Sequence, residues 1–257
     1  MALITGASSG IGAALAAVFA EHGHQVCITA RRKEHLDDIA SAIAAGGHKR
    51  PIVIPTDLGI RGGSARLAGA LDRRGLEPRF LVNNAAFGLY GEAAELPLDQ
   101  QLAMIDLDCR ALTDLSLRFV DSLTRRRGGI LNVASIAGFL TGENMAIYFA
   151  SKAYVVSFSQ ALRRELAPRG VKVSALCPGP VTTPFFNRAG FEYAAFPSFM
   201  YRSADFVART GYGGLMAGKP VIIPGAINKV VVLLDRLWPG IMRARHHLAK
   251  EPARAGG

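Results

Sequence analysis

Short apolar runs alternate with longer amphipathic segments along most of this 257-residue chain. The short runs are rich in β-branched residues and apolar throughout, which is typical of strands buried on both faces. The longer segments repeat apolar residues at spacings of three and four, as helices with one buried face do. This alternation predicts an α/β fold, in which a doubly wound, mostly parallel sheet of seven strands carries helices on both faces.

The predicted elements follow one another from the first residues to position 225. We predict strands at residues 2–5, 25–30, 51–55, 80–83, 129–134, 171–177 and 220–224. The main predicted helices span residues 11–21, 34–45, 98–124 and 145–167. Because the chain contains no repeat, low-complexity linker or shift in composition, we expect residues 1–225 to form a single domain.

Two segments depart from this alternation. Residues 184–207 are rich in Phe and Tyr, interspersed with Gly and Pro, which predicts an apolar flap rather than a regular element. Residues 226–257 are a basic tail rather than a separate domain. Its mixture of Val, Leu and Trp238 with Arg and His predicts an amphipathic helix over 229–250, broken near Pro239.

Composition narrows the class of protein. The net charge of +10 comes from basic residues dispersed in short groups, without a motif that reads nucleic acid, so we expect no nucleic-acid partner. Cys27, Cys109 and Cys177 lie far apart in apolar stretches, which favours free buried thiols over a metal site. No apolar run approaches the roughly 20 residues of a membrane span, and no signal-peptide layout opens the chain. We therefore expect a soluble cytoplasmic protein without a bound metal.

The clearest candidate site lies where the first predicted strand meets the first predicted helix. The loop there reads Thr5-Gly6-Ala7-Ser8-Ser9-Gly10-Ile11-Gly12. Gly6 suits a tight turn, Gly10 a close approach of backbone to phosphate, and Gly12 close packing of helix on strand. A P-loop is excluded because no Lys-Ser or Lys-Thr pair follows the last glycine. The loop predicts a dinucleotide cofactor whose pyrophosphate faces the helix N-terminus.

The end of the second predicted strand favours NADP(H). An acidic side chain there would bind the ribose 2′-hydroxyl of NAD, but Ala30 is followed by Arg31 and Arg32. A guanidinium group pairs with phosphate oxygens through two parallel hydrogen bonds, so we expect Arg31 to bind the 2′-phosphate. The alternative is a basic helix start that only faces solvent.

Further motifs occur in order along the chain. They are Asp57 after the third predicted strand, Asn83-Asn84-Ala85-Ala86 after the fourth, Ser135 after the fifth, Tyr148-Phe149-Ala150-Ser151-Lys152 in a helix, and Pro178-Gly179 with Thr183 after the sixth. With these motifs and the glycine loop, residues 2–225 resemble the short-chain dehydrogenases/reductases, which have a Rossmann-like fold. The resemblance implies an NADP(H)-dependent oxidoreductase that acts on CH–OH groups and exchanges hydride with a carbonyl or alcohol substrate.

The resemblance also implies the cofactor contacts. They are Gly6, Ser8, Ser9, Gly10, Ile11, Gly12, Arg31, Asp57, Leu58, Asn83, Ala85, Tyr148, Lys152, Pro178, Gly179, Val181 and Thr183. In the family, the position of Lys152 binds the nicotinamide ribose, and the positions of Asp57 and Leu58 contact adenine. The Pro178-Gly179 segment matches the one beside the nicotinamide carboxamide.

The residues themselves support catalytic roles for Tyr148, Lys152 and Ser135. Tyr148 and Lys152 stand four apart in a predicted helix and project from one face, about 6 Å apart along the axis. The Lys152 ammonium and a nicotinamide cation would lower the phenol pKa from about 10, so Tyr148 can act as general acid in reduction and general base in oxidation. Ser135 ends a central strand, where its hydroxyl is placed to stabilise a developing alkoxide.

One candidate catalytic position departs from the family pattern. The family usually carries an asparagine in the long helix before the catalytic serine, where it holds a water linked to the lysine. This chain has Asp108 there. A carboxylate accepts but cannot donate a hydrogen bond, and its charge offsets part of the effect of Lys152 on Tyr148. We expect activity with a shifted pH optimum, and a non-catalytic NADP(H) sensor or scaffold is the alternative.

Substrate and partners follow less directly from the sequence. The flap at 184–207 either lies over the nicotinamide, which favours an apolar substrate, or packs its rings against the sheet. The resemblance implies a homodimer or homotetramer formed through the fourth and fifth helices. The tail residues that suit an anionic membrane surface are Trp238, Arg243, Arg245 and Lys250, but packing of the tail on the protein or on another subunit is favoured.

Overall fold

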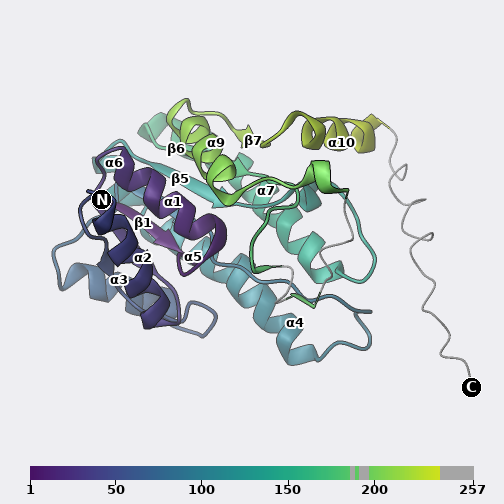
Figure 1. Cartoon of the computed structure of the whole chain (residues 1–257), viewed down its shortest axis with the longest axis horizontal. Coiled ribbons are helices and arrows are strands. Elements are labelled where there is room, and N and C mark those ends of the chain that lie inside the picture. Colours follow the sequence, from purple (N-terminus) through teal and green to yellow (C-terminus); the bar gives the residue numbers. More distant parts are fainter. Residues whose placement is uncertain (186–188, 191–196, 238–257) are drawn as a thin grey trace, which may run out of the picture.

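The computed structural model describes residues 1–185, 189–190 and 197–237, in which seven strands form one sheet (Figure 1). The strands are β1 (Ala2–Thr5), β2 (Val26–Thr29), β3 (Ile52–Val53), β4 (Phe80–Asn83), β5 (Gly129–Val133), β6 (Lys172–Leu176) and β7 (Val221–Ile222). They are ordered β3-β2-β1-β4-β5-β6-β7, and every neighbouring pair is parallel. The predicted fold class is confirmed, although five strands are shorter than predicted.

The strand order reverses between β1 and β4, and this reversal positions the site. β1 pairs with β2 on one side and with β4 on the other. In an open parallel sheet, connections that leave adjacent strands toward opposite faces create a crevice at the carboxyl ends of those strands. Both strands are buried along their whole length, as their continuous apolar sequences predict.

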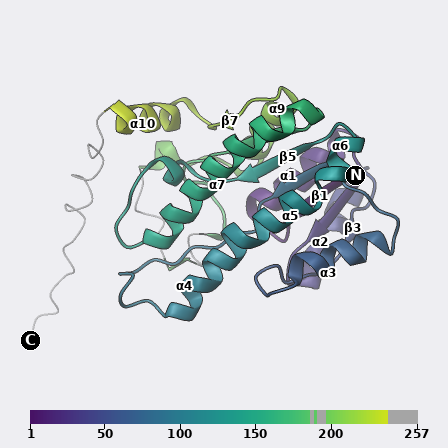
Figure 2. The same cartoon turned by 180° about the vertical axis from the view of Figure 1, so that it is seen from behind.

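Helices cover both faces of the sheet (Figures 1 and 2). One face carries α1 (Gly10–Glu21), α2 (Lys33–Ala45) and α9 (Ala204–Met216). The other carries α3 (Gly63–Asp72), α4 (Leu98–Ile105), α5 (Leu112–Arg118), α6 (Val120–Arg125) and α7 (Ala146–Leu166). Phe19 and Leu36 are buried in the first layer, and Leu71 and Leu162 in the second. The predicted double winding is therefore confirmed.

The prediction of one continuous helix over 98–124 is wrong. α4 is followed by a π-helical segment, η1 (Asp106–Ala111), and Phe119 separates α5 from α6 with φ −98° and ψ 7°. A π-helical turn changes which side chains face inward, and such turns are frequent at functional sites. Here Asp108 is buried, whereas Asp106 at the start of the same segment is half-exposed.

The predicted flap ends earlier than expected. α9 begins at Ala204, so the prediction that residues 184–207 lack regular structure is wrong at this end. A short 3₁₀ turn, η5 (Ser198–Met200), precedes it. Positions 186–188 and 191–196 of the flap lie outside the described residues.

Helix α10 (Ala226–Leu237) begins at the predicted boundary after residue 225 and three residues before the predicted tail helix. Asn228 and Val232 are buried, whereas Val230, Leu233 and Leu237 are exposed. The predicted break near Pro239 lies outside the described residues. In the ranges that the structure describes, no helix is long and apolar enough to cross a membrane.

The three cysteines are free thiols, but the prediction that all three are buried is wrong for Cys109, which is half-buried. Cys27 and Cys177 are buried, and burial raises the pKa of each to about 12. Thiols with such pKa values are poor nucleophiles at neutral pH. Among the described residues, His, Cys, Asp and Glu side chains form no group of three or more that could hold a metal ion.

Candidate active site

The glycine loop forms a compact turn between β1 and α1. Gly6 and Gly10 adopt φ angles of 64° and 57°, a left-handed conformation that other residues rarely adopt. At Gly12, a Cβ atom would lie 2.4 Å from Asn84 Nδ2 and 2.5 Å from the Gly6 carbonyl oxygen. Ser9 precedes α1 without capping it through its side chain. The first N–H groups of α1 therefore remain available to an anion.

The loops after β1 and β4 are tied together by hydrogen bonds. Thr5 Oγ1 accepts from the backbone N–H groups of Asn84 and Ala85, at 3.0 Å each. The Asn84 side-chain amide donates to the carbonyl oxygens of Thr5 and Gly6, at 3.0 and 3.1 Å. Asn84 thus fixes the glycine loop, a role that the sequence analysis missed although the residue stands inside a recognised motif.

The side chain of Asn83, a predicted cofactor contact, points into the protein interior. It is 3% exposed, and its Nδ2 donates to Ser116 Oγ at 3.0 Å and to Asn132 Oδ1 at 2.9 Å. Asn132 Nδ2 donates in turn to Ser159 Oγ at 2.9 Å. This polar chain links β4 and β5 to α5 and α7. The predicted cofactor contact of Asn83 therefore has to be made by its backbone, because its side chain is bonded inside the core.

The predicted adenosine contacts follow β2 and β3 at the same edge of the sheet. Arg31 is exposed directly before α2, and its side chain forms no hydrogen bond or ion pair within the described ranges. Asp57 is half-buried and its Oδ1 accepts from the Gly59 N–H at 2.9 Å, while Leu58 is buried. Arg31 is thus a free cation on the side of the cleft where a 2′-phosphate is expected.

Ser135, Tyr148 and Lys152 meet at the carboxyl end of β5. Ser135 caps the 3₁₀ segment η2 (Ile136–Phe139), where its Oγ accepts from the Ala137 N–H at 3.1 Å, and its hydroxyl is near enough to the Tyr148 phenol to lower the pKa of that group. Tyr148 and Lys152 share one face of α7, with Lys152 Nζ 5.4 Å from the centre of the Tyr148 ring. The structure brings together the three residues that the sequence singles out.

A buried ion pair joins Lys152 to the unexpected carboxylate. Lys152 Nζ lies 3.1 Å from Asp108 Oδ2, and the two side chains are 4% and 0% exposed. The pair is close enough for charge attraction but is not aligned as a hydrogen bond. Asp108 Oδ1 accepts from the Phe87 N–H at 3.1 Å. Asp108 therefore acts on Lys152 directly, rather than only through the water that the family pattern implies.

Burial and charge together set the protonation of these groups. Burial raises the pKa of Tyr148, while the Lys152 charge and the Ser135 hydroxyl lower it and the Asp108 charge raises it further. Burial opposes the charged form of Lys152, but Asp108 and Tyr148 outweigh this and raise its pKa. Burial also raises the pKa of Asp108, against the attraction of Lys152. The charge of Lys152 lowers the pKa of Tyr148, as predicted. Burial outweighs this effect, so the protein groups alone raise the pKa of Tyr148 instead of lowering it.

The segment after β6 contacts both the catalytic serine and the glycine loop. The Pro178 carbonyl oxygen accepts from the Ile136 N–H at 2.9 Å and from Ser135 Oγ at 3.4 Å. A Cβ atom at Gly10 would lie 3.0 Å from Thr183 Cγ2. The predicted nicotinamide segment therefore packs closely against Gly10 of the glycine loop and contacts Ser135 directly.

The flap contributes one described ring to the site. Val181 is buried and forms a parallel bridge with Arg202, which ties the two ends of the flap together. The Phe185 ring lies 5.5 Å from the Tyr148 ring, whereas Phe199 is 59% exposed. Phe185 is thus a described ring of the flap that lies against the catalytic tyrosine.

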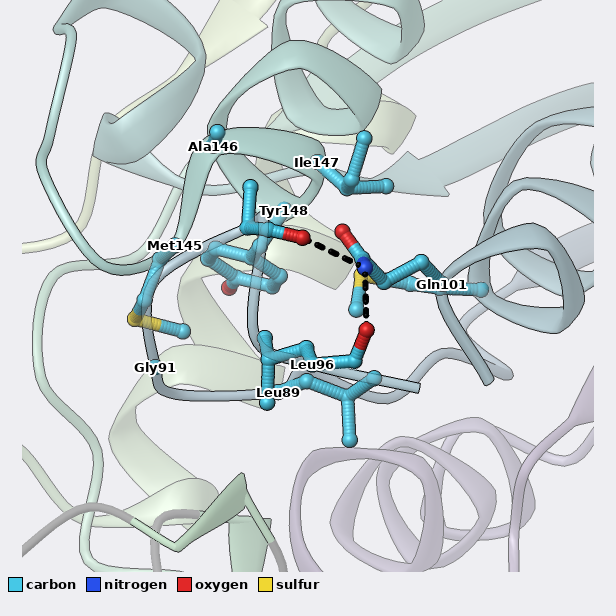
Figure 3. Close-up of a pocket in the computed structure, with 10 residues that line it drawn as sticks. Leu89, Gly91, Leu96, Gln101, Met145, Ala146, Ile147 and Tyr148 are labelled. Carbon is cyan, nitrogen blue, oxygen red and sulfur yellow. Dashed lines mark hydrogen bonds between the residues drawn. The ribbon is translucent and has the colours of Figure 1, made fainter. Parts of the chain in front are cut away.

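A small pocket opens beside Tyr148 (Figure 3). Its wall is mainly apolar and includes Leu89, Gly91, Ala93, Leu96, Met104, Met145, Ala146 and Ile147. Gln101 is buried there, and its Nε2 donates to the carbonyl oxygens of Ala93 and Leu96 at 2.9 Å each. Gln101 thereby holds the loop that forms one wall. The sequence did not predict this pocket, because its residues come from three separate segments.

The comparison of sequences identifies related proteins over most of the chain. The family model described as short chain dehydrogenase matches residues 1–192. A protein of Streptomyces virginiae, named as a ketoacyl reductase of the monensin polyketide synthase, is 38% identical over 201 residues, which are 76% of each chain. A Staphylococcus aureus protein named only as an oxidoreductase is 33% identical over 186 residues, which are 71% of this chain and 78% of its own.

Comparison with solved structures identifies similar folds over the full length of the chain. A short-chain dehydrogenase from Sphingobium yanoikuyae, in complex with NADPH, has a TM-score of 0.82 and 30% identity, and the match covers 100% of this chain and 97% of that one. The bulky-bulky ketone specific alcohol dehydrogenase from Comamonas testosteroni has a TM-score of 0.77 and 29% identity, with coverage of 100% and 96%.

Proposed function

Because the chain belongs to the short-chain dehydrogenase/reductase family of oxidoreductases, we propose that it transfers hydride between NADP(H) and the carbonyl or alcohol carbon of an apolar substrate. The observation that carries the proposal is the meeting of Ser135, Tyr148 and Lys152 beside the segment that begins at Pro178. A phenol, a hydroxyl and a cation thus converge at the crevice beside the glycine loop.

The residues of the cleft fit a dinucleotide. Ser9 leaves the N-terminus of α1 uncapped by its side chain, so the first N–H groups of that helix can hold a pyrophosphate. Lys152 and the segment at Gly179 would hold the nicotinamide half. When bound, the cofactor supplies or accepts the hydride at its nicotinamide ring.

In the reductive direction, Tyr148 donates its phenolic proton to the substrate oxygen as that oxygen gains negative charge. The Ser135 hydroxyl donates a hydrogen bond to the same oxygen. Lys152 stabilises the phenolate that remains, because its charge favours the ionised form of Tyr148. In the oxidative direction the phenolate removes the alcohol proton. The raised pKa of Tyr148 then makes oxidation favour alkaline pH.

The preference for NADP(H) over NAD(H) rests on Arg31. Its guanidinium group is exposed at the end of β2 and has no partner within the part of the chain that the structure describes. The Sphingobium yanoikuyae neighbour is a complex with NADPH, which supports the same choice. Paired fluorescence titrations with NADPH and NADH test it. We expect tighter binding of NADPH, and equal affinities would contradict the proposal.

The apolar wall beside Tyr148 supports an apolar substrate. Buried apolar surface favours a ligand that brings apolar surface of its own. The Comamonas testosteroni neighbour is specific for bulky ketones. A screen of apolar ketones, aldehydes and alcohols against polar sugars of similar size tests this class. Turnover confined to the polar compounds would contradict it.

We further propose a homodimer or homotetramer formed through the predicted fourth and fifth helices, which correspond to α4 to α6 and to α7 in the structure. Leu98, Leu102 and Ile105 lie along α4 and are 69%, 52% and 40% exposed, and Leu117 of α5 is 53% exposed. Leu98, Leu102 and Ile105 are spaced to share one face of α4, and an exposed apolar face of this kind favours protein association. Size-exclusion chromatography with light scattering should give the mass of a dimer or tetramer. The mass of a monomer at every protein concentration would contradict this proposal.

A second candidate function is a non-catalytic NADP(H) sensor or scaffold. The observation that favours it is the Asp108 carboxylate, which offsets part of the charge that Lys152 offers to Tyr148. The two functions differ in one measurable respect. A sensor binds NADPH tightly and alters a partner interaction, yet turns over no compound in the screen.

A further inference from the structure

Helix α10 contributes a buried polar side chain to the back of the cleft. α10 lies beyond residues 1–192, which the family model matches, and it packs against η2, the segment that follows Ser135. Asn228 in its first turn is 2% exposed. Asparagine is rarely buried to this extent without a specific role.

Asn228 packs directly on Gly179. A Cβ atom at Gly179 would lie 2.3 Å from Asn228 Oδ1 and 2.6 Å from both Cγ and Nδ2. These three atoms are the nearest obstacles to such a Cβ. The Asn228 amide therefore occupies the space that a side chain at Gly179 would fill. Residue 179 has to be glycine because Asn228 stands behind it.

The hydrogen bonds of Asn228 fix its position but leave one atom unused. Nδ2 donates to the Pro224 carbonyl oxygen at 2.8 Å, across the turn that leads into α10. Oδ1 is buried without a hydrogen-bond partner in the described part of the chain. A leucine of similar size would fill the same space without an unpaired acceptor. Packing alone therefore does not account for an amide at this position.

The contact continues from Gly179 to the catalytic serine. The carbonyl oxygen of the preceding residue, Pro178, accepts from Ser135 Oγ at 3.4 Å and from the Ile136 N–H at 2.9 Å. Movement of Gly179 would therefore move the acceptor that orients the Ser135 hydroxyl. Asn228 therefore acts on the serine only through the Pro178-Gly179 segment that it packs against.

We propose that Asn228 is a positioning residue that holds the Pro178-Gly179 segment in the geometry required to bind the nicotinamide half of the cofactor. This inference rests on the proposed function, because it assigns the segment to nicotinamide. It extends the site to a helix outside the family model.

The first test compares the affinities of two ligands for the Asn228→Ala variant. NADPH spans the whole cleft, whereas adenosine 2′,5′-bisphosphate occupies only the adenosine side. We expect the variant to bind NADPH about tenfold more weakly and to bind the bisphosphate as wild type does, as measured by calorimetry. Val230→Ala, an exposed change on the same helix, is the control and should alter neither affinity.

The outcomes separate this inference from the proposed function. If wild type does not bind NADPH, the proposed function fails and this inference fails with it. If wild type binds NADPH but Asn228→Ala weakens both ligands equally, or neither, only this inference is overturned. Equal weakening would indicate a general loss of structure rather than a loss of positioning.

A double-mutant cycle tests the contact itself without cofactor. Gly179→Ala alone should lower the thermal unfolding midpoint, because its Cβ would overlap the Asn228 amide. In the Asn228→Ala background the obstacle is removed, so the same change should cost much less. Additive shifts in the midpoint would overturn the contact and with it the proposal.

Discussion

On the adenosine side of the cleft, the glycine loop comes from one continuous strand–turn–helix stretch, whereas on the nicotinamide side Asp108, Ser135, Lys152, Gly179 and Asn228 come from five separate segments. The first side is held by backbone conformation and close packing at Gly6 and Gly12, with hydrogen bonds from the Asn84 amide to the loop backbone. The second is held by side chains, including an ion pair that is almost completely buried. The two sides should therefore respond differently to substitution.

The largest expected effect is on the nicotinamide side. Lys152→Met leaves the Asp108 carboxylate buried without its cation, which should cost about 3–5 kcal/mol of unfolding free energy. Chemical denaturation measures this cost. The control is Arg118→Met, which breaks an exposed pair with Asp114 and should cost at most about 1 kcal/mol. Equal costs for the two variants would show that burial does not distinguish the pairs.

The next effect is on the adenosine side. Gly12→Ala places a methyl group against Asn84 and the Gly6 carbonyl, which should cost about 1–3 kcal/mol of stability and weaken NADPH binding. Gly213→Ala in α9 meets no atom within 4 Å and should stabilise the protein by up to about 1 kcal/mol. Parallel thermal unfolding checks both, and an unaffected Gly12→Ala variant would refute the close packing.

A smaller effect is expected at the outer edge of the adenosine side. Arg31→Ala should weaken NADPH binding roughly tenfold, because one charge-assisted contact to the 2′-phosphate is lost at an exposed site. NADH binding should not change, since NADH lacks that phosphate. Lys33→Ala, which removes an exposed cation paired with Asp37, is the matched control. A parallel loss of NADH affinity would contradict a role in cofactor selection.

The smallest effect concerns pH on the nicotinamide side. The Asp108 charge raises the pKa of Tyr148, so Asp108→Asn should lower it. The alkaline rise in oxidation rate and the alkaline fall in reduction rate should both move to lower pH. Asp106→Asn, in the same π-helical segment but paired with Arg110, removes a half-exposed charge and should leave both profiles unchanged. Superimposable profiles for Asp108→Asn and wild type would contradict a direct effect on Tyr148.

The same contrast explains what the sequence could predict. The seven strands and the glycine loop follow from local pattern, since Gly6, Gly10 and Gly12 are constrained by neighbours a few residues away. The meeting of Ser135, Tyr148 and Lys152 followed from motif order and is present in the structure.

Contacts between residues far apart in the sequence could not be predicted in the same way. The π-helical turn that buries Asp108 differs from an α-helix by one residue per turn and leaves little trace in apolar spacing. Asn228 contacts Gly179 across the fold, and the Asn83 side chain pairs with Ser116 inside the core. Neither contact has a signature in the local sequence, because both partners are ordinary polar or small residues.

The central claim, that Tyr148 is the proton donor in hydride transfer from NADPH, is tested most directly by carbonyl-dependent oxidation of NADPH. Wild type and Tyr148→Phe are compared at saturating NADPH with a ketone found in the screen. We expect the variant to bind NADPH as wild type does, but to lose roughly a hundredfold to ten-thousandfold in turnover. Turnover by Tyr148→Phe at the wild-type rate would contradict the account.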